Sequence, residues 1–572
     1  MNEDIRLYSE NDGKSYDVPL GSTLEDFSNA HFPTVQSEKT GVMVPVLAAL
    51  VDHKLCDLNY QVIQSQLVKF IGYDHPEARR CYIRSLIFVL QVAVRKMFPD
   101  KVLAVDYSLP TGLYCEVHEL EPLDNGSPQK YFLTDEKLEE LKVRMQEIID
   151  ADLPFIKTRR PVEAAAEIFR KNHQPKKATL MESLGKCFCH VYYLDGVADT
   201  FHGPLLVSTG KIKLFDILGF NEGFCLQYPL EGSIDKQPQM KRQSKLAATL
   251  NEHSDWCNRL NIKGIGSLNQ AIRDGKAIDL INLSEALHER KYAEIANRIY
   301  ERRGSVKIVF IAGPSSSGKT SSSLRLALQC RVLGLNPKVI ELDNYFVSRS
   351  RTPKDENGEY DFECLGAMDI ELLNKQLNAL LAGETVEIPR YDFKTGEPVY
   401  EGNFMTLGEK DILIMEGIHA LNPEMVPGVD NSRIFRVYAS ALTSLNIDEN
   451  NNLSTADNRL IRRMVRDNQF RGYSPESTIL RWHSVRKGEN KNIFPFQENA
   501  DAAFNSAHIF EFSVLKYYAE PLLRRIPASS PAYTEAARLL KFFDYVVALS
   551  PDEIAAIPPT SIMREFIGGQ TL

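Results

Sequence analysis

The sequence lacks any long apolar run, since no stretch reaches the roughly 18–20 residues that a membrane-spanning helix needs. The longest apolar stretches lie near residues 41–51 and 85–94, and the first of them contains Pro45. The start of the chain is polar and acidic, with no basic region ahead of an apolar one, so no secretory signal is expected. We therefore expect no membrane contact and a cytoplasmic location.

Patterned cysteines and a basic excess are also missing. The nine cysteines form no CxxC pair, which argues against a disulfide framework or a zinc ribbon and favours a reducing compartment. The 67 basic residues are outnumbered by 76 acidic ones, so bulk attraction to nucleic acid is not expected. The hydrophobic fraction of 43% and the charged fraction of 25% are ordinary for a soluble globular chain.

Four stretches of different character follow one another along the 572 residues. Residues 1–65 contain short strands and turns. Residues 66–235 mix helix and strand, with helical apolar spacing at 78–98 and 133–149. A polar passage at 235–243 marks a boundary, and residues 236–300 are expected to form a helical connector. From residue 301 to 572, apolar strands alternate with helices, which predicts a parallel α/β sheet.

A phosphate-binding loop is predicted where a strand-like run at 306–312 meets a helix-compatible run. The sequence between them has the spacing GxxxxGK[ST], in the strand–loop–helix context that this motif requires. Main-chain N–H groups and the helix N-terminus would bind phosphate oxygens, while the lysine reaches the β- and γ-phosphates and the threonine hydroxyl binds Mg²⁺. The predicted ATP-binding residues are Gly313, Pro314, Ser315, Ser316, Ser317, Gly318, Lys319 and Thr320.

Two further buried-strand patterns end in acids. Asp343 ends the run 338–343, and Glu416 ends the run 411–416. Ligands of open α/β sheets lie beyond the carboxyl ends of the strands. Asp343 is therefore expected to accept a proton from a hydroxyl nucleophile or to hold the metal, and Glu416 to hold Mg²⁺ directly or through water. The alternative for each is an acid that merely caps a turn.

Arginines cluster downstream of these elements, at positions 459, 462, 463, 466 and 471. The first four share one broad face of a helix. In isolation such a run is as often a solvated basic face. Downstream of a phosphate loop, a closing lid is the more attractive interpretation, because its arginines neutralise the transferring phosphoryl group and its closure excludes water.

Residues from about 305 to 525 resemble the uridine kinase/phosphoribulokinase family. Six ordered motifs carry the resemblance, and in sequence letters they are GPSSSGKT at 313–320, DNYF at 343–346, YDFE at 360–363 continuing to AMD at 367–369, IPRYDF at 388–393, EGI at 416–418, and RRxxRDxxxRG at 462–472. The resemblance implies a P-loop kinase that uses ATP and Mg²⁺.

The resemblance also implies roles for individual residues. Asp343 matches the acid that activates a nucleoside 5′-hydroxyl, and Lys319 and Arg466 complete the expected catalytic set. Thr320 and Glu416 match the metal-binding positions. The substrate-binding positions are Glu363 for ribose hydroxyls, Tyr391 and Phe393 for the base, and Arg463 and Arg471 for phosphates. The two aromatics could instead be core residues.

Several positions depart from the family pattern. Gly396 stands where nucleoside kinases of the family often have a histidine, and Tyr473 replaces a second arginine of the RG-R motif. Arg390 precedes Tyr391 where a neutral residue is more usual, and Glu363 is one methylene longer than the usual aspartate. Because pocket contacts to polar groups set substrate discrimination, these changes bear on the acceptor and not on phosphoryl transfer.

The N-terminal half resembles two other modules. GSTLEDF at 21–27 and ALVDHKLCDL at 49–58 are similar to a TGS domain, a small β-grasp module, although four basic against ten acidic residues in 1–65 argue against phosphate-backbone binding. Residues from about 70 to 230 resemble the editing-type second domain of threonyl-tRNA synthetases. The four metal-ligand positions of that domain hold Arg84, Phe88, Phe201 and Leu205 here, so editing chemistry is not expected.

A second metal interpretation is weak. Cys187, Cys189, His190 and His202 lie in the same region, but alternate residues of a strand point to opposite faces. The overall expectation is a multi-domain α/β protein: an N-terminal β-grasp (TGS) unit, an α+β editing-like domain without metal ligands, and a C-terminal P-loop kinase whose parallel sheet is flanked by helices.

The preferred function is ATP-dependent phosphorylation of a nucleoside, uridine or cytidine first, at its 5′-hydroxyl, as in nucleoside salvage. Two alternatives stay open: a nucleotide-responsive regulatory protein that contacts RNA or a translation factor through its N-terminal half, and a kinase of another small alcohol or sugar phosphate, with Arg390 as an anion contact. The intact Asp343, Glu416 and lid arginines argue against a pure switch. A homo-oligomeric state also stays open.

Overall fold

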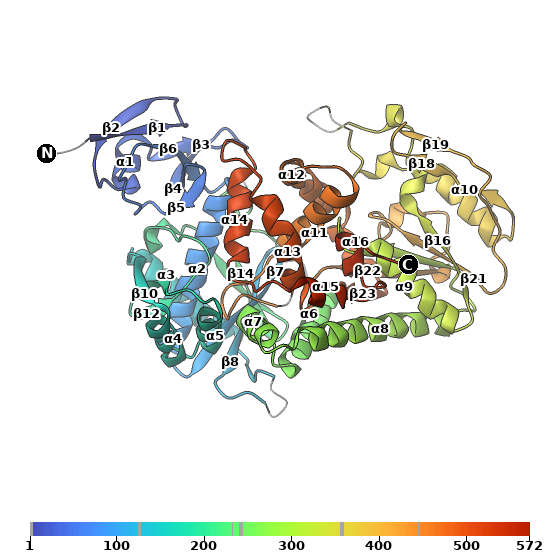
Figure 1. Cartoon of the computed structure of the whole chain (residues 1–572), viewed down its shortest axis with the longest axis horizontal. Coiled ribbons are helices and arrows are strands. Elements are labelled where there is room, and N and C mark those ends of the chain that lie inside the picture. Colours follow the sequence, from blue (N-terminus) through green and yellow to red (C-terminus); the bar gives the residue numbers. More distant parts are fainter. Residues whose placement is uncertain are drawn as a thin grey trace.

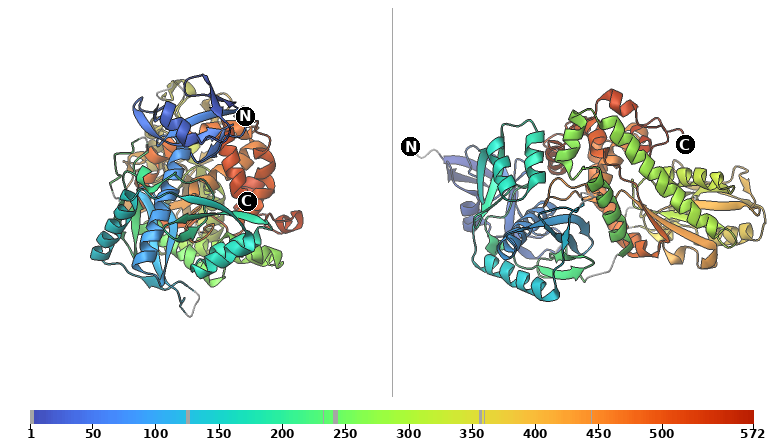
Figure 2. Two further views of the ribbon diagram at one scale, coloured as in Figure 1. Left: turned by 90° about the vertical axis from the view of Figure 1, so that its left-hand side faces the viewer. Right: turned by 90° about the horizontal axis from the view of Figure 1, so that it is seen from below.

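The computed structural model describes residues 4–123, 127–231, 233–239, 244–354, 358, 360–443 and 445–572; the last four residues of the expected boundary passage, 240–243, lie outside it. Two lobes occupy opposite ends of the long axis, and helices fill the space between them (Figures 1 and 2). Within these ranges, no helix combines the length and apolarity that crossing a bilayer demands.

The first unit is a small sheet packed on one helix. Its strand order is β2-β1-β6-β4-β3, with β5 on β4, and β1 and β6 run parallel at its centre, as in a β-grasp fold. The helix begins after Thr23, whose side chain accepts the Asp26 amide, and it buries Leu24 and Phe27. The elements are β1 (Asp4–Ser9), β2 (Ser15–Pro19), α1 (Leu24–His31), β3 (Thr34–Gln36), β4 (Met43–Val51), β5 (Lys54–Cys56) and β6 (Gln66–Gly72). The sheet thus includes a strand beyond residue 65.

The second unit is an α+β arrangement around one long buried helix, α2. One sheet has the order β13-β14-β8-β7 with β9 on β8, and a second sheet has the order β10-β11-β12. The elements are α2 (Pro76–Met97), β7 (Lys101–Leu109), β8 (Gly112–Glu119), β9 (Lys130–Tyr131), α3 (Asp135–Asp150), β10 (Ile156–Pro161), α4 (Val162–Lys171), α5 (Pro175–Ser183), β11 (Phe188–Leu194), β12 (Val197–Asp199), β13 (Asp216–Phe220) and β14 (Gly223–Gln227). The helical spacing at 78–98 and 133–149 is confirmed by α2 and α3.

The connector consists of α6 (Ser244–Arg259), α7 (Ile265–Arg273) and α8 (Ala277–Glu301). It does not behave as a loose linker, because one continuous hydrophobic core includes Phe169 of α4, Ile281 of α8 and Phe512 near the C-terminus. In Figure 1, α8 runs along the lower edge from the second unit to the C-terminal sheet.

The C-terminal unit is built on a fully parallel five-stranded sheet of order β16-β21-β15-β22-β23. Its strands are β15 (Ile308–Ala312), β16 (Asn336–Glu341), β21 (Asp411–Glu416), β22 (Ile434–Ser440) and β23 (Ala502–Asn505). Its helices are α9 (Lys319–Val332), α10 (Ile370–Leu381), α11 (Thr455–Phe470), α12 (Pro475–Asn492), α13 (Glu511–Leu523), α14 (Tyr533–Phe543), α15 (Pro551–Ala555) and α16 (Met563–Ile567). Two small ribbons pair β17 (Val386–Glu387) with β20 (Phe404–Met405) and β18 (Arg390–Asp392) with β19 (Glu397–Val399). The expected α/β class is confirmed.

Candidate active site

The loop between β15 and α9 has the backbone shape of a phosphate cradle. Ser316 and Gly318 adopt left-handed conformations, with φ of 58° and 78°, and Gly318 precedes the first residue of α9. Gly313 has no room for a side chain, because a Cβ there would lie 1.9 Å from the carbonyl oxygen of Ala439 on the neighbouring strand β22. This strand–loop–helix backbone is of the kind in which main-chain amides and a helix N-terminus bind a phosphate group.

A hydroxyl and a carboxylate meet beside this loop. Thr320 Oγ1, in the first turn of α9, donates to Glu416 Oε1 at 2.6 Å. Glu416 ends β21, which lies next to β15 in the sheet. Burial raises the pKa of Glu416, while the Lys319 ammonium and the Thr320 hydrogen bond oppose the increase. Two oxygen ligands of this kind suit Mg²⁺, so Thr320 and Glu416 fit the expected metal positions.

Asp343 lies at the same edge of the sheet. It occupies a short 3₁₀ turn, Leu342–Tyr345, directly after β16, and β16 neighbours β21. Burial raises the pKa of Asp343, and the Lys319 ammonium lowers it. The negative charge of Asp343 also raises the pKa of Glu416, and that of Glu341 raises the pKa of Asp343. The Lys319 ammonium lowers the pKa of both Asp343 and Glu416, so one lysine faces these two acids. This edge gathers the groups that a phosphoryl acceptor and its metal require.

Helix α11 presents its arginines to the phosphate loop, but two of them are fully buried. Arg459 pairs with both carboxylate oxygens of Glu489 on α12 and donates to the Ser315 carbonyl at 3.1 Å. Arg462 pairs with Glu511 in the same manner and donates to the Ser506 carbonyl at 2.8 Å. The interpretation as a solvated basic face is therefore wrong for Arg459 and Arg462. Both are buried and contact main-chain carbonyls of the phosphate loop.

Glu489 is a site residue that sequence patterns did not predict. Its Oε1 accepts the Ser315 amide at 3.0 Å while the carboxylate holds Arg459, so it clamps the phosphate loop from 174 residues away. The two arginines, Arg459 and Arg486, lower the pKa of Glu489 against the opposing effect of burial. No local pattern in α12 marks such a partner.

We expect Glu489→Gln to lower the free energy of unfolding by about 3 kcal/mol, because Arg459 is left buried without its counter-charge. The measurement is urea unfolding followed by the fluorescence of Trp482, whose ring lies 5.4 Å from the Arg459 guanidinium carbon. Glu520→Gln, in a more exposed pair with Arg524, is the control and should cost under about 1 kcal/mol. Equal losses in both variants would contradict the clamp.

The remaining arginines converge on one carboxylate. Arg463, Arg466 and Arg471 lie 3.3, 2.9 and 3.7 Å from the oxygens of Asp467. Arg463 also donates to Ser315 Oγ at 2.6 Å. Burial lowers the pKa of Arg463 and of Arg471. Among the described residues, Asp467 is the one acid within ion-pair distance of these three arginines, so positive charge remains next to the loop, which suits a highly charged anion.

The predicted acceptor residues begin next to the Asp343 turn, where the Tyr391 amide donates to Asn344 Oδ1 at 3.3 Å, and they differ in exposure. Glu363 is half-buried, and a Cβ on Gly488 of α12 would lie 2.6 Å from its own Cβ. Burial and the nearby Glu489 raise the pKa of Glu363 to about 7. Tyr391 is buried, whereas Phe393 is 60% exposed, and their ring centroids lie 5.1 Å apart. Tyr391 is thus a core aromatic at the edge of the site, and Phe393 is free to meet a ligand.

Two of the departures from the family pattern have structural partners. Arg390 is paired with both carboxylate oxygens of Glu401 at 2.7 and 2.8 Å on an exposed hairpin, so it is engaged elsewhere. Gly396 has φ of 77°, and a Cβ there would lie 2.7 Å from Arg349 Nε. Arg349 in turn donates to the Phe393 carbonyl at 2.7 Å. A guanidinium therefore packs where the family often has a histidine.

The C-terminal segment also reaches the phosphate loop. Glu565 of α16 accepts from Ser321 Oγ at 2.6 Å, and Gln570 donates to the same hydroxyl at 2.8 Å. A Cβ on Gly318 would meet Ile562 at 2.7 Å. These residues were not predicted as part of the site, because no local pattern in the last residues of the sequence indicates where they fold back.

In the second unit, packing groups occupy the four positions that the resemblance to the synthetase domain aligns with metal ligands. Arg84 donates to the Pro204 carbonyl at 2.9 and 3.1 Å, and Phe88 lies 5.4 Å from Phe201, ring centroid to centroid. Leu205 is buried as well. The described residues contain no group of three or more histidine, cysteine, aspartate or glutamate side chains arranged to hold a metal, the set of Cys187, Cys189, His190 and His202 included.

Comparisons with known proteins find relatives of both kinds that the sequence motifs predict, a kinase family and threonine–tRNA ligases. The family model described as Phosphoribulokinase / Uridine kinase family matches residues 308–511. A uridine kinase of Macrococcus caseolyticus is 31% identical over 195 residues, which are 34% of this chain and 85% of that protein. A threonine–tRNA ligase of Desulforamulus reducens is 26% identical over 208 residues, which are 36% of this chain and 30% of the ligase.

Among solved structures, one described as a possible uridine kinase from Bacillus stearothermophilus aligns with a TM-score of 0.24 and 20% identity. It covers 35% of this chain and 89% of its own.

Proposed function

The chain belongs to the phosphoribulokinase/uridine kinase family, and on this premise we propose that it transfers the γ-phosphoryl group of ATP to the 5′-hydroxyl of a nucleoside, uridine or cytidine first. One observation carries the proposal: Asp343 shares the carboxyl edge of the sheet with Lys319 and with the Thr320–Glu416 pair. A nucleotide binder without an acceptor needs no base at this place.

The proposed reaction uses these groups as follows. The amides of the loop and the Lys319 ammonium bind the phosphate tail, and Asp343 takes the proton of the acceptor hydroxyl as its oxygen attacks the γ-phosphorus. The new O–P bond forms while the bond to the β-phosphate oxygen breaks, and ADP leaves. Thr320 and Glu416 would hold Mg²⁺, which supplies charge neutralisation when bound. Arg463, Arg466 and Arg471 are assigned to the transferring phosphoryl group.

The acceptor side is assigned to Glu363, Tyr391 and Phe393. Glu363 would accept hydrogen bonds from ribose hydroxyls, and Phe393 would stack on the base. A second acceptor class, a small alcohol that carries an anionic group, is favoured by one observation: Arg349 occupies the space next to Gly396. Polar pocket contacts of this kind decide between the two classes.

The test is a coupled ADP-release assay with ATP and Mg²⁺ over a panel of nucleosides, sugars and sugar phosphates. The proposal expects turnover to depend on a nucleoside. Turnover only with an anionic alcohol would move the assignment to the second class. No acceptor-dependent turnover with any member would overturn the kinase proposal.

Glu363 gives a pH prediction. Since its pKa is raised to about 7, it is ionised above pH 7 and protonated below, and only the carboxylate accepts from two hydroxyls. We expect the KM for the nucleoside to rise about tenfold between pH 8 and pH 6, as a single group with this pKa titrates. Steady-state kinetics of Glu363→Gln should show a high KM without this slope. A slope that persists in the variant would contradict the role.

A further inference from the structure

We propose that Arg538 of α14 is a positioning residue for phosphoryl transfer: it fixes helix α11, and with it the arginines that face the phosphate loop, against the second unit. The inference rests on the proposed function for its kinetic readout, but its structural readout does not depend on the acceptor. It gives the N-terminal half a role, namely to hold the lid helix of the kinase.

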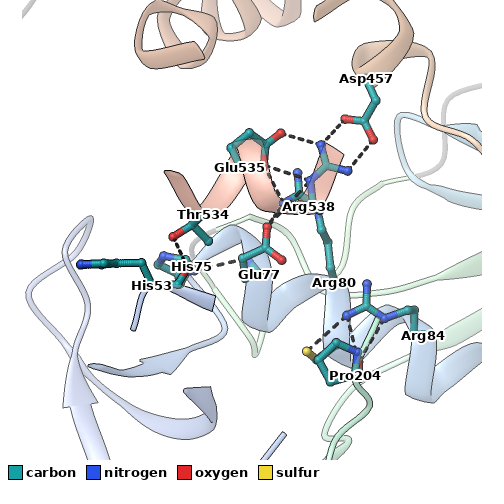
Figure 3. A network of polar contacts seen from close by, with 11 residues as sticks. His53, His75, Glu77, Arg80, Arg84, Pro204, Asp457, Thr534, Glu535 and Arg538 are labelled. Carbon is teal, nitrogen blue, oxygen red and sulfur yellow. Dashed lines mark hydrogen bonds and ion pairs between the residues drawn. The ribbon is translucent and has the colours of Figure 1, made fainter. Parts of the chain in front are cut away.

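The contact itself is bidentate and largely shielded. The two terminal nitrogens of Arg538 donate to the two carboxylate oxygens of Asp457, each at 2.8 Å. Asp457 lies in the first turn of α11, and the Arg538 side chain is 13% exposed. Figure 3 shows this fork, with Glu535 on the other side of the same guanidinium. A planar, two-point contact fixes direction as well as distance.

The same cluster is tied to the second unit. Arg80 of α2 donates to Glu535 Oε2 at 3.3 Å, and Glu77 of α2 lies 3.9 Å from Arg538 (Figure 3). Burial alone would raise the pKa of Glu535, but Arg538 and Arg80 lower it to about 2. The carboxylate therefore stays charged, and α2, α14 and α11 form one chain of ion pairs.

Helix α14 also contacts the first unit. Thr534 Oγ1 donates to the His53 carbonyl at 2.9 Å, in the turn between β4 and β5. Helix α14 thus lies between both N-terminal units and α11, as its red ribbon beside the blue α2 shows in Figure 1.

The chain that leads into α11 is held by the second unit as well. Asn446 donates to the carbonyls of Val105 and Asp106 at 3.1 and 2.9 Å, and the Glu449 carbonyl accepts the Val105 amide at 2.9 Å. These contacts place the start of α11 from a second direction, independently of Arg538.

A buried lysine reinforces this docking. Lys177 of α5 is fully buried and donates to Asn450 at 2.8 Å, with Asp199 at 2.7 Å and Asp448 at 3.5 Å. Asn451 donates to the Thr200 carbonyl at 3.1 Å. Because a buried lysine needs its partners, the segment at 445–453 cannot leave the second unit without cost.

The position of the first turn of α11 affects the arginines near the phosphate loop, because they lie on the same rigid helix. Arg463 lies six residues after Asp457, about 9 Å along the helix at 1.5 Å per residue. Its 2.6 Å contact with Ser315 Oγ therefore depends on the direction that the first turn imposes. A shift of about 1 Å at a reacting centre can cost up to about 10²-fold in rate.

The experiment uses the full chain with Trp256→Phe, which leaves Trp482 as the one tryptophan of the sequence. Trp482 packs on Arg459 of α11 and is 9% exposed. Its emission wavelength and its quenching by acrylamide therefore report whether α11 keeps its position against this ring. Arg538→Gln removes the fork, and Asp457→Asn removes its charge while leaving the Arg538, Glu535 and Glu77 contacts. Arg524→Gln, in an exposed pair on α13, is the matched control.

We expect Arg538→Gln and Asp457→Asn to lower kcat about tenfold, with the KM for ATP changed under about threefold, and to make Trp482 red-shifted and more quenchable. The control should match the parent. If Arg538→Gln does not fold, Asp457→Asn decides alone. Unchanged kcat and unchanged Trp482 emission in a folded variant would overturn the inference. If the parent shows no turnover with any acceptor, the proposed function fails, and the Trp482 readout still tests the anchorage.

Discussion

Asp343→Asn is expected to lower kcat about 10³-fold while the Kd for ATP changes by less than roughly twofold. The amide keeps the size and the hydrogen-bonding reach of the carboxylate but cannot take a proton from the acceptor hydroxyl. Steady-state kinetics with the preferred nucleoside, together with calorimetric titration of ATP, measure the two quantities separately.

Asp411→Asn is the matched control for this variant. It makes the same chemical change at the first residue of β21, at the end of the strands opposite to Glu416, where Asp411 accepts from the Gly408 amide. The control should retain the parental rate. A near-parental kcat for Asp343→Asn would show that Asp343 is not the base, whatever else the site does.

Arg466→Gln is the second large effect. We expect kcat to fall about 10³-fold, because the Arg466 guanidinium is assigned to stabilising the negative charge that develops on the phosphoryl oxygens. Its contact with Asp467 uses two of its N–H groups and leaves the others for this interaction. The KM for the nucleoside should change little, since the interaction is made in the transition state. The measurement is kcat and KM at saturating ATP.

Arg481→Gln on α12 controls for the loss of a positive charge near the lid, since Arg481 is exposed and packs on Tyr473. A loss shared equally by the two variants would indicate a general electrostatic effect. A loss confined to KM in Arg466→Gln would assign Arg466 to binding instead.

The phosphate loop and the two strand-end acids were predictable because their chemistry is encoded in local spacing. The run GxxxxGKT, with an apolar strand before it and a helix after it, predicts the phosphate loop. The predicted strand end at Asp343 is displaced by two residues, because β16 ends at Glu341 and Asp343 lies in the turn that follows, but this turn and Glu416 at the end of β21 still reach the same edge of the parallel sheet. The helix with its arginines was equally visible as a period of three to four residues.

The partners of those arginines were not predictable. A run of arginines on one helical face is typical of a solvent-exposed surface when no acidic partner is known. The partners here, Glu489 for Arg459 and Glu511 for Arg462, lie 30 and 49 residues further along the chain. The return of Glu565 to Ser321 spans 244 residues. Such pairs are set by tertiary packing, for which a single sequence carries no local signal.

The division into units was predictable from changes in the sequence pattern, but the packing of the units against one another was not. The stretch 236–300 reads as a connector, whereas its helices belong to the same core as α4 and α13. Sequence patterns likewise gave no sign that α14 carries an ion-pair network between Arg80 and Asp457. Helix α11, which the sequence predicts as a lid, is anchored on the N-terminal half by these contacts.

The most direct measurement is ³¹P nuclear magnetic resonance of a reaction containing the full chain, ATP, Mg²⁺ and uridine, run beside Asp343→Asn. The account predicts one equivalent of nucleoside 5′-monophosphate for each ADP with the parent, and neither product above background with the variant. ADP accompanied by inorganic phosphate alone, or equal product from both proteins, would contradict it.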